Sequence, residues 1–387
     1  MNSRERLLTA LDGGQPDRLP VSTHHVMPYF LDKYLGGISD QAFFDRFGLD
    51  PTTWLWDVKP DSTRGEYWVD VPGSFAGAGG RLVASDQWRI TARSLTGGTD
   101  RATRYDITTP DGPLSMVLRH GTQTDWVVER LLKEKAQIAM LERYAPVPLC
   151  DAAAINRQAE ATAERGILRG AVPGFQIYGQ PGCWQDAAVL FGIERLIMET
   201  HDDPAWVHAF LRVLRDRKLT AVASMAGARL DVIELGGGDA SSTVISPKIF
   251  EEFVAPYDAA LIGEAHRVGL RVVYHTCGGM MPLLELIAGM NPDAMETFTP
   301  PSLGGDVNLR EAKARIGDRV CMIGGFDQWR FLQGCTPDET RRAVRQCFAD
   351  AGEGGGYILA PSDHFFDADV ELISAFAEEA RSCRYAG

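Results

Sequence analysis

The chain has 387 residues, of which 45% are hydrophobic and 24% are charged, a composition typical of a globular protein with a large buried core. Its formal net charge is −13, and no run of lysines or arginines forms a track for phosphates, which argues against nucleic acid as a partner. Seven cysteines without the spacing of a disulfide scaffold indicate reduced thiols and a cytoplasmic protein, and no stretch of about 18 apolar residues predicts a membrane span.

The first predicted elements are a short amphipathic helix over residues 3–11 and a strand over residues 17–22. His24 and His25 follow that strand directly. Nothing in their spacing selects a metal ion, so we expect a loop or core pair of histidines rather than ligands.

Between about residues 65 and 125 the chain changes to short strand-like pieces, such as residues 81–84, 87–91 and 102–109, separated by glycine, aspartate and proline. Residues 110–113 (PDGP) are a turn signal, because proline presets φ and glycine supplies a positive φ. This pattern predicts an antiparallel meander, inserted within the main domain or packed against it. Two roles are open for this meander: it covers a pocket, or its role is purely structural.

From about residue 165 short apolar strands alternate with helices. Strands are expected at residues 167–172, 231–235, 271–275, 293–297, 320–323 and 357–360. Helices are expected at residues 249–268, 309–316 and 337–351, the last with Thr336 as its N-cap. This alternation implies a parallel sheet with right-handed crossovers. The number of units, and the lack of a GxGxxG motif after the first strand, favour an α/β fold of the (β/α)8 TIM-barrel type over residues 1–387, with residues 65–125 as an insertion.

Chemically active side chains gather where the predicted strands end, which is the working face of a βα barrel. His275 ends a strand and Cys277 follows it, so both point to the same face if the extended geometry continues, and imidazole with thiolate favours zinc. A buried cysteine beside a structural histidine is the alternative. The other polar groups expected at this rim are Asp239, Glu296, Asp327, Asp363 and His364. Asp239 and Asp327 have helix capping as their alternative role.

Several segments resemble the uroporphyrinogen decarboxylase superfamily, and together they span nearly the whole chain. Residues 4–8 (RERLL) and 16–21 (PDRLPV) are similar to its opening, and residues 324–327 (GGFD) resemble its G-G-[IF]-D loop. The most specific match is residues 245–257 (ISPKIFEEFVAPY). The resemblance implies a (β/α)8 barrel, in agreement with the pattern of elements.

Two branches of this superfamily differ near the N-terminus. The decarboxylases carry an RQAGR motif whose arginines bind the carboxylates of the porphyrinogen. The corresponding residues 21–28 (VSTHHVMP) contain no arginine, so a tetrapyrrole with many carboxylates would meet no such clamp here.

The cobalamin-linked methyltransferases, such as the methylcobamide:coenzyme M enzymes, hold zinc by an HxC motif and a distant cysteine in an APGCG context. His275 and Cys277 resemble the first part. Residues 358–364 (ILAPSDH) resemble the second, except that Asp363 takes the place of the cysteine and His364 stands beside it. This departure leaves coenzyme M as a substrate in doubt, although a carboxylate or imidazole still completes a zinc site.

The resemblance therefore implies a zinc-dependent methyltransferase that moves a methyl group between a corrinoid (cobalamin) and a small-molecule thiol, tetrahydrofolate or methyl ether. The implied zinc ligands are His275, Cys277, Asp363 and His364, and the candidate catalytic groups are Asp239, Glu296 and Asp327. The chain has no DxHxxG cobalamin-binding motif, so the corrinoid is expected on a partner protein or free. The alternatives are a metal-independent decarboxylase of a uroporphyrinogen-like or aromatic acid, and a non-catalytic partner of a corrinoid protein or binder of a small molecule.

Overall fold

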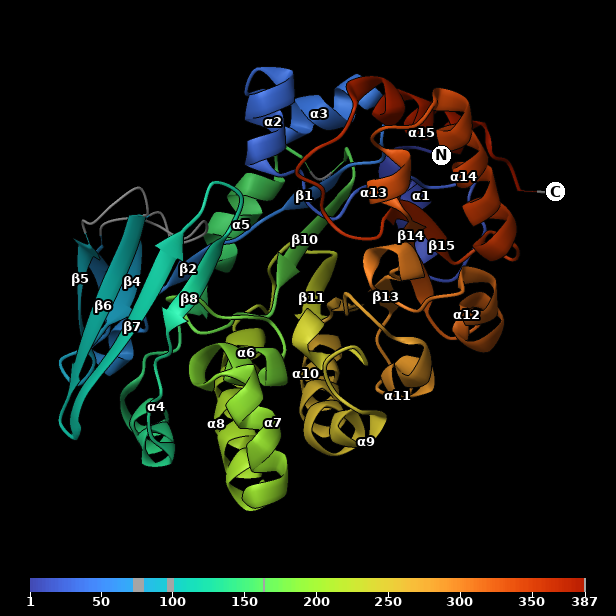
Figure 1. Cartoon of the computed structure of the whole chain (residues 1–387). Coiled ribbons are helices and arrows are strands. Elements are labelled where there is room, and N and C mark those ends of the chain that lie inside the picture. Colours follow the sequence, from blue (N-terminus) through green and yellow to red (C-terminus); the bar gives the residue numbers. More distant parts are fainter. Residues whose placement is uncertain (72–79, 96–100, 163, 386–387) are drawn as a thin grey trace.

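The computed structural model describes residues 1–71, 80–95, 101–162 and 164–385, and a curled parallel sheet lies at its centre (Figure 1). In spatial order its strands are β1 (Thr52–Trp54), β10 (Ile167–Ala171), β11 (Val232–Gly236), β12 (Arg271–His275), β13 (Ala294–Thr297), β14 (Cys321–Phe326) and β15 (Tyr357–Pro361). Val21 bridges in parallel to Leu359 of β15, and its carbonyl accepts the backbone N–H of Asp50 just before β1. This segment closes the gap between the first and last strands. The predicted (β/α)8 TIM barrel is confirmed.

The predicted first strand, residues 17–22, was wrong in extent. Only Val21 makes a β-bridge there. Pro20 has no N–H to donate, and the N–H of Val21 donates to the carboxylate of Asp50 instead of a strand carbonyl. The ladder therefore breaks after one residue. The strands predicted after residue 165 correspond to β10 to β15.

Helices surround the barrel (Figure 1). They are α1 (Ser3–Leu11), α2 (Pro28–Leu35), α3 (Asp40–Phe47), α4 (Ile138–Tyr144), α5 (Ala152–Ala159), α6 (Cys183–Phe191), α7 (Ile193–Asp202), α8 (Pro204–Ala223), α9 (Pro247–Ile249), α10 (Ala255–Arg267), α11 (Leu284–Gly289), α12 (Leu309–Ile316), α13 (Gln328–Phe331), α14 (Pro337–Ala351) and α15 (Val370–Ser382). The predicted bounds of α1, α12 and α14 are confirmed, and Thr336 caps α14 in a capping box with Glu339. None of the described helices is long and apolar enough to cross a membrane.

The helix predicted over residues 249–268 is present in two parts. A π-helical turn, Phe250–Val254, separates α9 from α10. Pro256 lies in the first turn of α10, two residues after this π-helical turn, and cannot donate to the carbonyl four residues earlier. The wider turn accommodates a residue that a regular α-helix would reject.

An antiparallel sheet stands beside the barrel (Figure 1). The strands outside the barrel are β2 (Val58–Lys59), β3 (Tyr67–Asp70), β4 (Arg81–Ala84), β5 (Arg89–Leu95), β6 (Arg101–Thr109), β7 (Gly112–His120), β8 (Asp125–Glu129) and β9 (Leu149–Cys150). β5 to β8 form a four-stranded meander, and Thr109 pairs with Gly112 across the predicted PDGP turn. The antiparallel meander is thus confirmed, while its standing as an insertion within one domain stays a prediction.

The N-terminal end of the barrel is filled with apolar side chains. This cluster joins α1 to the inward face of the strands and contains Leu7, Ala10, Leu11, Ile167, Val232, Val273, Ala294, Cys321, Ile323, Ile358 and Ala360. Because strand side chains alternate between the two faces, residues two positions further along each strand also point inward. Any polar layer in the barrel must therefore begin at the other end, toward the carboxyl ends of the strands.

Asp258 of α10 is a buried carboxylate that links three elements on the outside of the barrel. It accepts hydrogen bonds from the backbone N–H of Cys183, at the start of α6, at 3.1 Å and from the hydroxyl of Tyr274, on β12, at 3.0 Å. Burial raises the pKa of Asp258 from 3.8 to about 6. The folded protein therefore holds this proton more tightly than the unfolded chain does, and stability falls as the pH rises between these two values.

Replacement of Asp258 by asparagine is expected to remove this loss, because the amide keeps an oxygen acceptor and does not ionise. The advantage of the variant over the wild type in free energy of unfolding should grow by about 1–2 kcal/mol between roughly pH 5 and pH 8. Urea denaturation of both proteins at the two pH values measures this difference. If the variant and the wild type differ by the same free energy of unfolding at both pH values, Asp258 is ionised over the whole pH range.

Candidate metal centre

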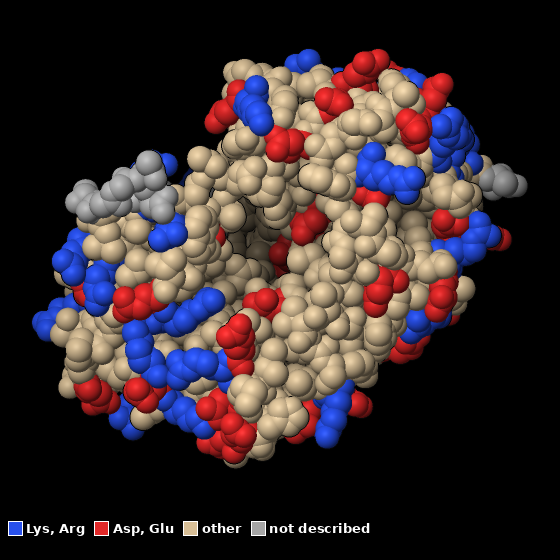
Figure 2. All heavy atoms as spheres, in the orientation of Figure 1, with Lys and Arg blue, Asp and Glu red and all other residues tan. Residues whose placement is uncertain are grey.

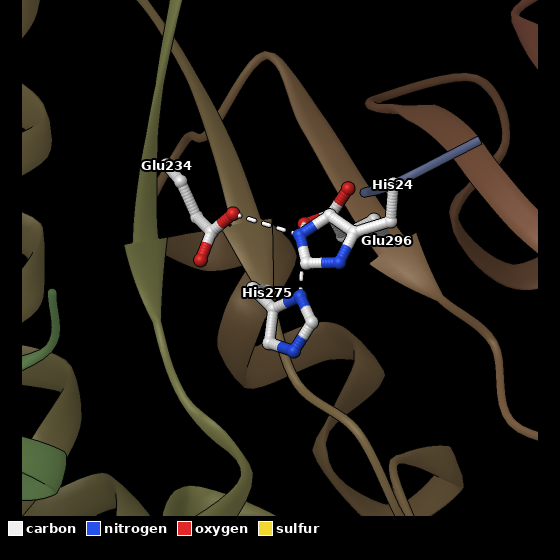
Figure 3. A group of neighbouring side chains, drawn as sticks. All are labelled: His24, Glu234, His275 and Glu296. Carbon is white, nitrogen blue, oxygen red and sulfur yellow. Dashed lines mark hydrogen bonds and ion pairs between the residues drawn. The ribbon is translucent and has the colours of Figure 1, made fainter. Parts of the chain in front are cut away.

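An ionisable layer follows the apolar layer inside the barrel. Arg169, Glu234, His275 and Glu296 each stand two residues beyond an apolar member of the inward face on β10 to β13. His275 pairs with Glu296 in the register between β12 and β13, so their side chains lie next to each other. Figure 3 shows Glu234, His275 and Glu296 converging from three strands. Strand alternation alone therefore assembles this layer.

Arg169 balances the two buried glutamates of this layer. Its Nη2 lies 2.5 Å from Glu234 Oε2 and 2.5 Å from Glu296 Oε1, and its Nη1 lies 2.9 Å from Glu296 Oε2. Burial by itself raises the pKa of Glu296, but the charges of Arg169 and of His24 outweigh it and hold that pKa well below its usual value. Both carboxylates are thus ionised and already paired, and a cation placed between them would meet the guanidinium.

His275 is oriented by one member of this layer and presents its other nitrogen to the barrel mouth. Its Nδ1 lies 2.9 Å from Glu296 Oε1, which leaves Nε2 as the nitrogen available to a ligand. His275, Cys277 and Asp363 each offer a ligand atom, and these atoms lie within 4.8 Å of one another. Imidazole, thiolate and carboxylate are all zinc ligands, and a carboxylate on the second imidazole nitrogen is the usual outer support of such a site. The residues present fit a zinc ion.

The glycines after β11 leave room for the thiol. A Cβ placed on Gly238 would lie 2.6 Å from Cys277 Sγ. Gly236 adopts a φ of 104°, and a Cβ there would lie 2.4 Å from the carbonyl oxygen of His275. The three glycines at residues 236–238 therefore let the backbone approach the two predicted ligands closely.

His24 is buried in this layer, as expected of a core histidine, and it also belongs to two of the candidate metal groups. Its Nε2 lies 2.9 Å from Glu234 Oε2, and its ring stacks on His275 with centroids 4.8 Å apart (Figure 3). Burial lowers the pKa of His24, but the charges of Glu296 and Glu234 outweigh this and raise it to about 9. His25 instead stacks on the ring of Trp54 at 4.3 Å and belongs to none of the candidate metal groups found among the described residues.

The predicted fourth ligand, His364, lies with Asp363 but not with the thiol. Its Nδ1 is 2.9 Å from Asp363 Oδ1, and it forms a candidate metal group with Asp363 and His24. The described residues that group with His275 and Cys277 include Asp363 and not His364. Of the four predicted ligands, three therefore lie within reach of one ion, and the fourth, His364, contacts the carboxylate of Asp363.

Two predicted catalytic groups, Asp239 and Asp327, make contacts of a structural kind. Asp239 Oδ2 accepts from Gln185 Nε2 at 3.0 Å, and its backbone N–H donates to Gln185 Oε1 at 2.6 Å. Asp327 caps α13 by accepting the backbone N–H of Arg330 at 2.9 Å, and it also accepts the hydroxyl of Ser302. Neither carboxylate belongs to a candidate metal group among the residues that the structure describes.

The site opens to solvent. Figure 2 shows a hollow in the molecular surface with carboxylate side chains in its walls. The side chain of Asp363 is 24% exposed, whereas those of His275 and Glu296 are 10% and 3% exposed. A small molecule can therefore approach the ligand set from the side of Asp363, while the supporting charges stay shielded from water.

Comparison with known proteins gives a family and a fold. The model of the uroporphyrinogen decarboxylase (URO-D) family matches residues 104–383. A methylated-thiol–coenzyme M methyltransferase of Methanosarcina mazei is 25% identical over 198 residues, which cover 51% of this chain and 50% of that protein. A uroporphyrinogen decarboxylase of Hydrogenovibrio crunogenus is 26% identical over 206 residues, which cover 50% of this chain and 54% of that protein. The matched stretch thus spans about half the length of these relatives.

Among solved structures, a methyltransferase from Methanosarcina mazei superposes with a TM-score of 0.62 and covers 99% of both chains. Its sequence is 16% identical, so the likeness concerns the fold. It supports the barrel described above over the full length of the chain.

Proposed function

The chain belongs to the uroporphyrinogen decarboxylase family, and within this family we propose that it is a zinc-dependent methyltransferase that moves a methyl group between a corrinoid and a small-molecule donor or acceptor. Its relatives in the family are enzymes of two kinds, methyltransferases and decarboxylases. The choice between these two activities therefore depends on the site and not on the family.

One observation carries the proposal: His275, Cys277 and Asp363 offer an imidazole, a thiol and a carboxylate within 4.8 Å of one another at the open end of the barrel. Glu296 holds Nδ1 of His275 and so fixes the ring with Nε2 toward the other two groups. Three protein ligands leave a coordination position for a substrate, which is the arrangement of catalytic rather than structural zinc.

Bound zinc would supply a Lewis acid that stabilises a thiolate, or the oxygen anion left when an ether loses its methyl group. The chain's own residues position and shield the reaction. Glu296 and Arg169 keep the His275 ring in place, and the buried layer beneath it excludes water from one side of the site. We propose that the corrinoid, as methyl carrier, enters from the open side on a partner protein or free.

The charges at the mouth favour this reading over decarboxylation. A porphyrinogen has many carboxylates and needs cationic side chains to bind them. Arg169, the arginine in this layer, is already engaged by Glu234 and Glu296, and residues 21–28 contain no arginine. Neither this arginine nor residues 21–28 therefore offers a free guanidinium to a polyanionic substrate.

Methyl transfer can be followed by the absorbance change of methylcobalamin on loss of its methyl group. Zinc-loaded protein is offered thiols and tetrahydrofolate in turn, and methyl ethers are tested in the reverse direction with reduced cobalamin. We expect turnover with at least one of them, and its loss in chelated protein. Release of CO₂ from uroporphyrinogen by chelated protein, with no methyl transfer in any reaction, would instead establish the decarboxylase.

A further inference from the structure

A second group of metal-ligand side chains adjoins the proposed zinc site. His24, Asp363 and His364 offer ligand atoms within 4.8 Å of one another. His24 Nδ1 lies 3.3 Å from Asp363 Oδ1, and His364 Nδ1 lies 2.9 Å from the same oxygen. The three residues come from opposite ends of the chain, so the closure of the barrel brings them together.

The free nitrogen of His24 is the feature that points to a ligand. The side chain of His24 is only 8% exposed, yet its Nδ1 makes no hydrogen bond and has only the ion pair with Asp363 Oδ1, at 3.3 Å. An unsatisfied buried nitrogen is costly. A cation in front of Nδ1 would satisfy it. Without one, a proton on Nδ1 faces the carboxylate of Asp363.

His24 is supported in the same way as the proposed zinc ligand His275. Glu234 Oε2 lies 2.9 Å from His24 Nε2, and Glu296 Oε1 lies 2.9 Å from His275 Nδ1. Each ring thus has one nitrogen anchored on a carboxylate that Arg169 also binds. A carboxylate on the outer nitrogen orients an imidazole for metal binding, so both histidines are prepared for it.

Asp363 is shared between the two groups. The contacts that the described residues make with its carboxylate all involve Oδ1, which faces His24 and His364. Asp363 also belongs to the group of His275 and Cys277. A carboxylate has two oxygens, and one can serve each side.

We propose that His24, Asp363 and His364 form a second cation site next to the one formed by His275, Cys277 and Asp363, with Asp363 bridging the two. Two imidazoles and a carboxylate suit a divalent first-row transition metal. Three carboxylates and one thiolate around the two sites, less the charge of Arg169, leave about three negative charges, which offset most of the charge of two dications. The inference takes the proposed zinc site as its neighbour and does not depend on methyl transfer.

Cobalt(II) titration of the metal-free protein tests the proposal, with metal per chain measured by native mass spectrometry. The near-ultraviolet absorption of a cobalt–thiolate bond reports on Cys277, the cysteine that belongs to a candidate metal group among the described residues. We expect two cobalt ions per wild-type chain, and one per chain with the thiolate band retained in His24→Ala and in His364→Ala. In Cys277→Ser we expect one ion without the band. His25→Ala, which alters a neighbouring histidine outside both groups, should still bind two.

His364 is 35% exposed, so the His364→Ala protein should fold even if the buried His24 cannot be replaced. One cobalt ion per wild-type chain would overturn the proposal. So would loss of the thiolate band in His24→Ala or in His364→Ala, since that histidine would then be a ligand of a single site. If the protein binds two ions but transfers no methyl group, the second cation site is supported and the proposed function is rejected.

Discussion

Replacement of Arg169 by methionine is expected to lower the free energy of unfolding by about 3–5 kcal/mol, because two buried carboxylates would lose the cation that neutralises them. The side chains of Arg169, Glu234 and Glu296 are 4%, 12% and 3% exposed, so water cannot take over the role of the guanidinium. Methionine fills a similar length without a charge. Chemical denaturation of the variant and the wild type at neutral pH measures the loss.

The cause of that loss can be separated from lost packing. In the triple variant Arg169→Met/Glu234→Gln/Glu296→Gln no unpaired charge remains, and we expect it to be more stable than Arg169→Met alone. Arg104 is a matched control, because it also lies between two carboxylates, Asp106 and Glu129, but on the surface. Arg104→Met should cost less than about 1 kcal/mol. Equal losses in free energy of unfolding for the two arginine variants would mean that burial does not make the ion pairs of Arg169 more important to stability.

The fold was predictable wherever the hydrophobic pattern and the capping residues of a segment indicated the same element. β10 to β15 are buried on both faces and read as short apolar runs, and α14 carries a capping box that marks its first residue. The first strand was not predictable in extent. Pro20 precedes Val21, and the side chain that accepts the N–H of Val21, that of Asp50, lies 29 residues away in the sequence.

The site was predictable in part, for a geometric reason. His275 ends β12 and Cys277 follows two residues later, so an extended course past the end of the strand predicts that both face the same way. Their ligand atoms do belong to one group. His24 has no such partner, because Glu234 is 210 residues away and only the barrel closure joins them. Arg169 and Glu234 did leave a signal that was missed: each is a charged residue in the middle of a buried apolar strand, at an inward-facing position.

The simultaneous replacement of His275 and Cys277 by alanine is expected to remove one equivalent of bound zinc and to abolish methyl transfer. These residues supply two of the three ligands that meet at the barrel mouth. Since the loss of an outer-shell partner already costs about 10–100-fold in metal affinity, the loss of two direct ligands should cost more. Metal analysis after dialysis, with methylcobalamin turnover on the same samples, measures both effects.

Cys335→Ala is the matched control, because Cys335 is also a half-buried free thiol and belongs to none of the candidate metal groups in the described part of the chain. It should leave both zinc content and turnover unchanged. Unchanged zinc content in the double variant would reject the thiolate site, and the proposed zinc chemistry with it. Full turnover without that zinc would separate methyl transfer from zinc binding. The leaving heteroatom would then be stabilised by something other than an ion held by the imidazole, thiol and carboxylate at the mouth of this barrel.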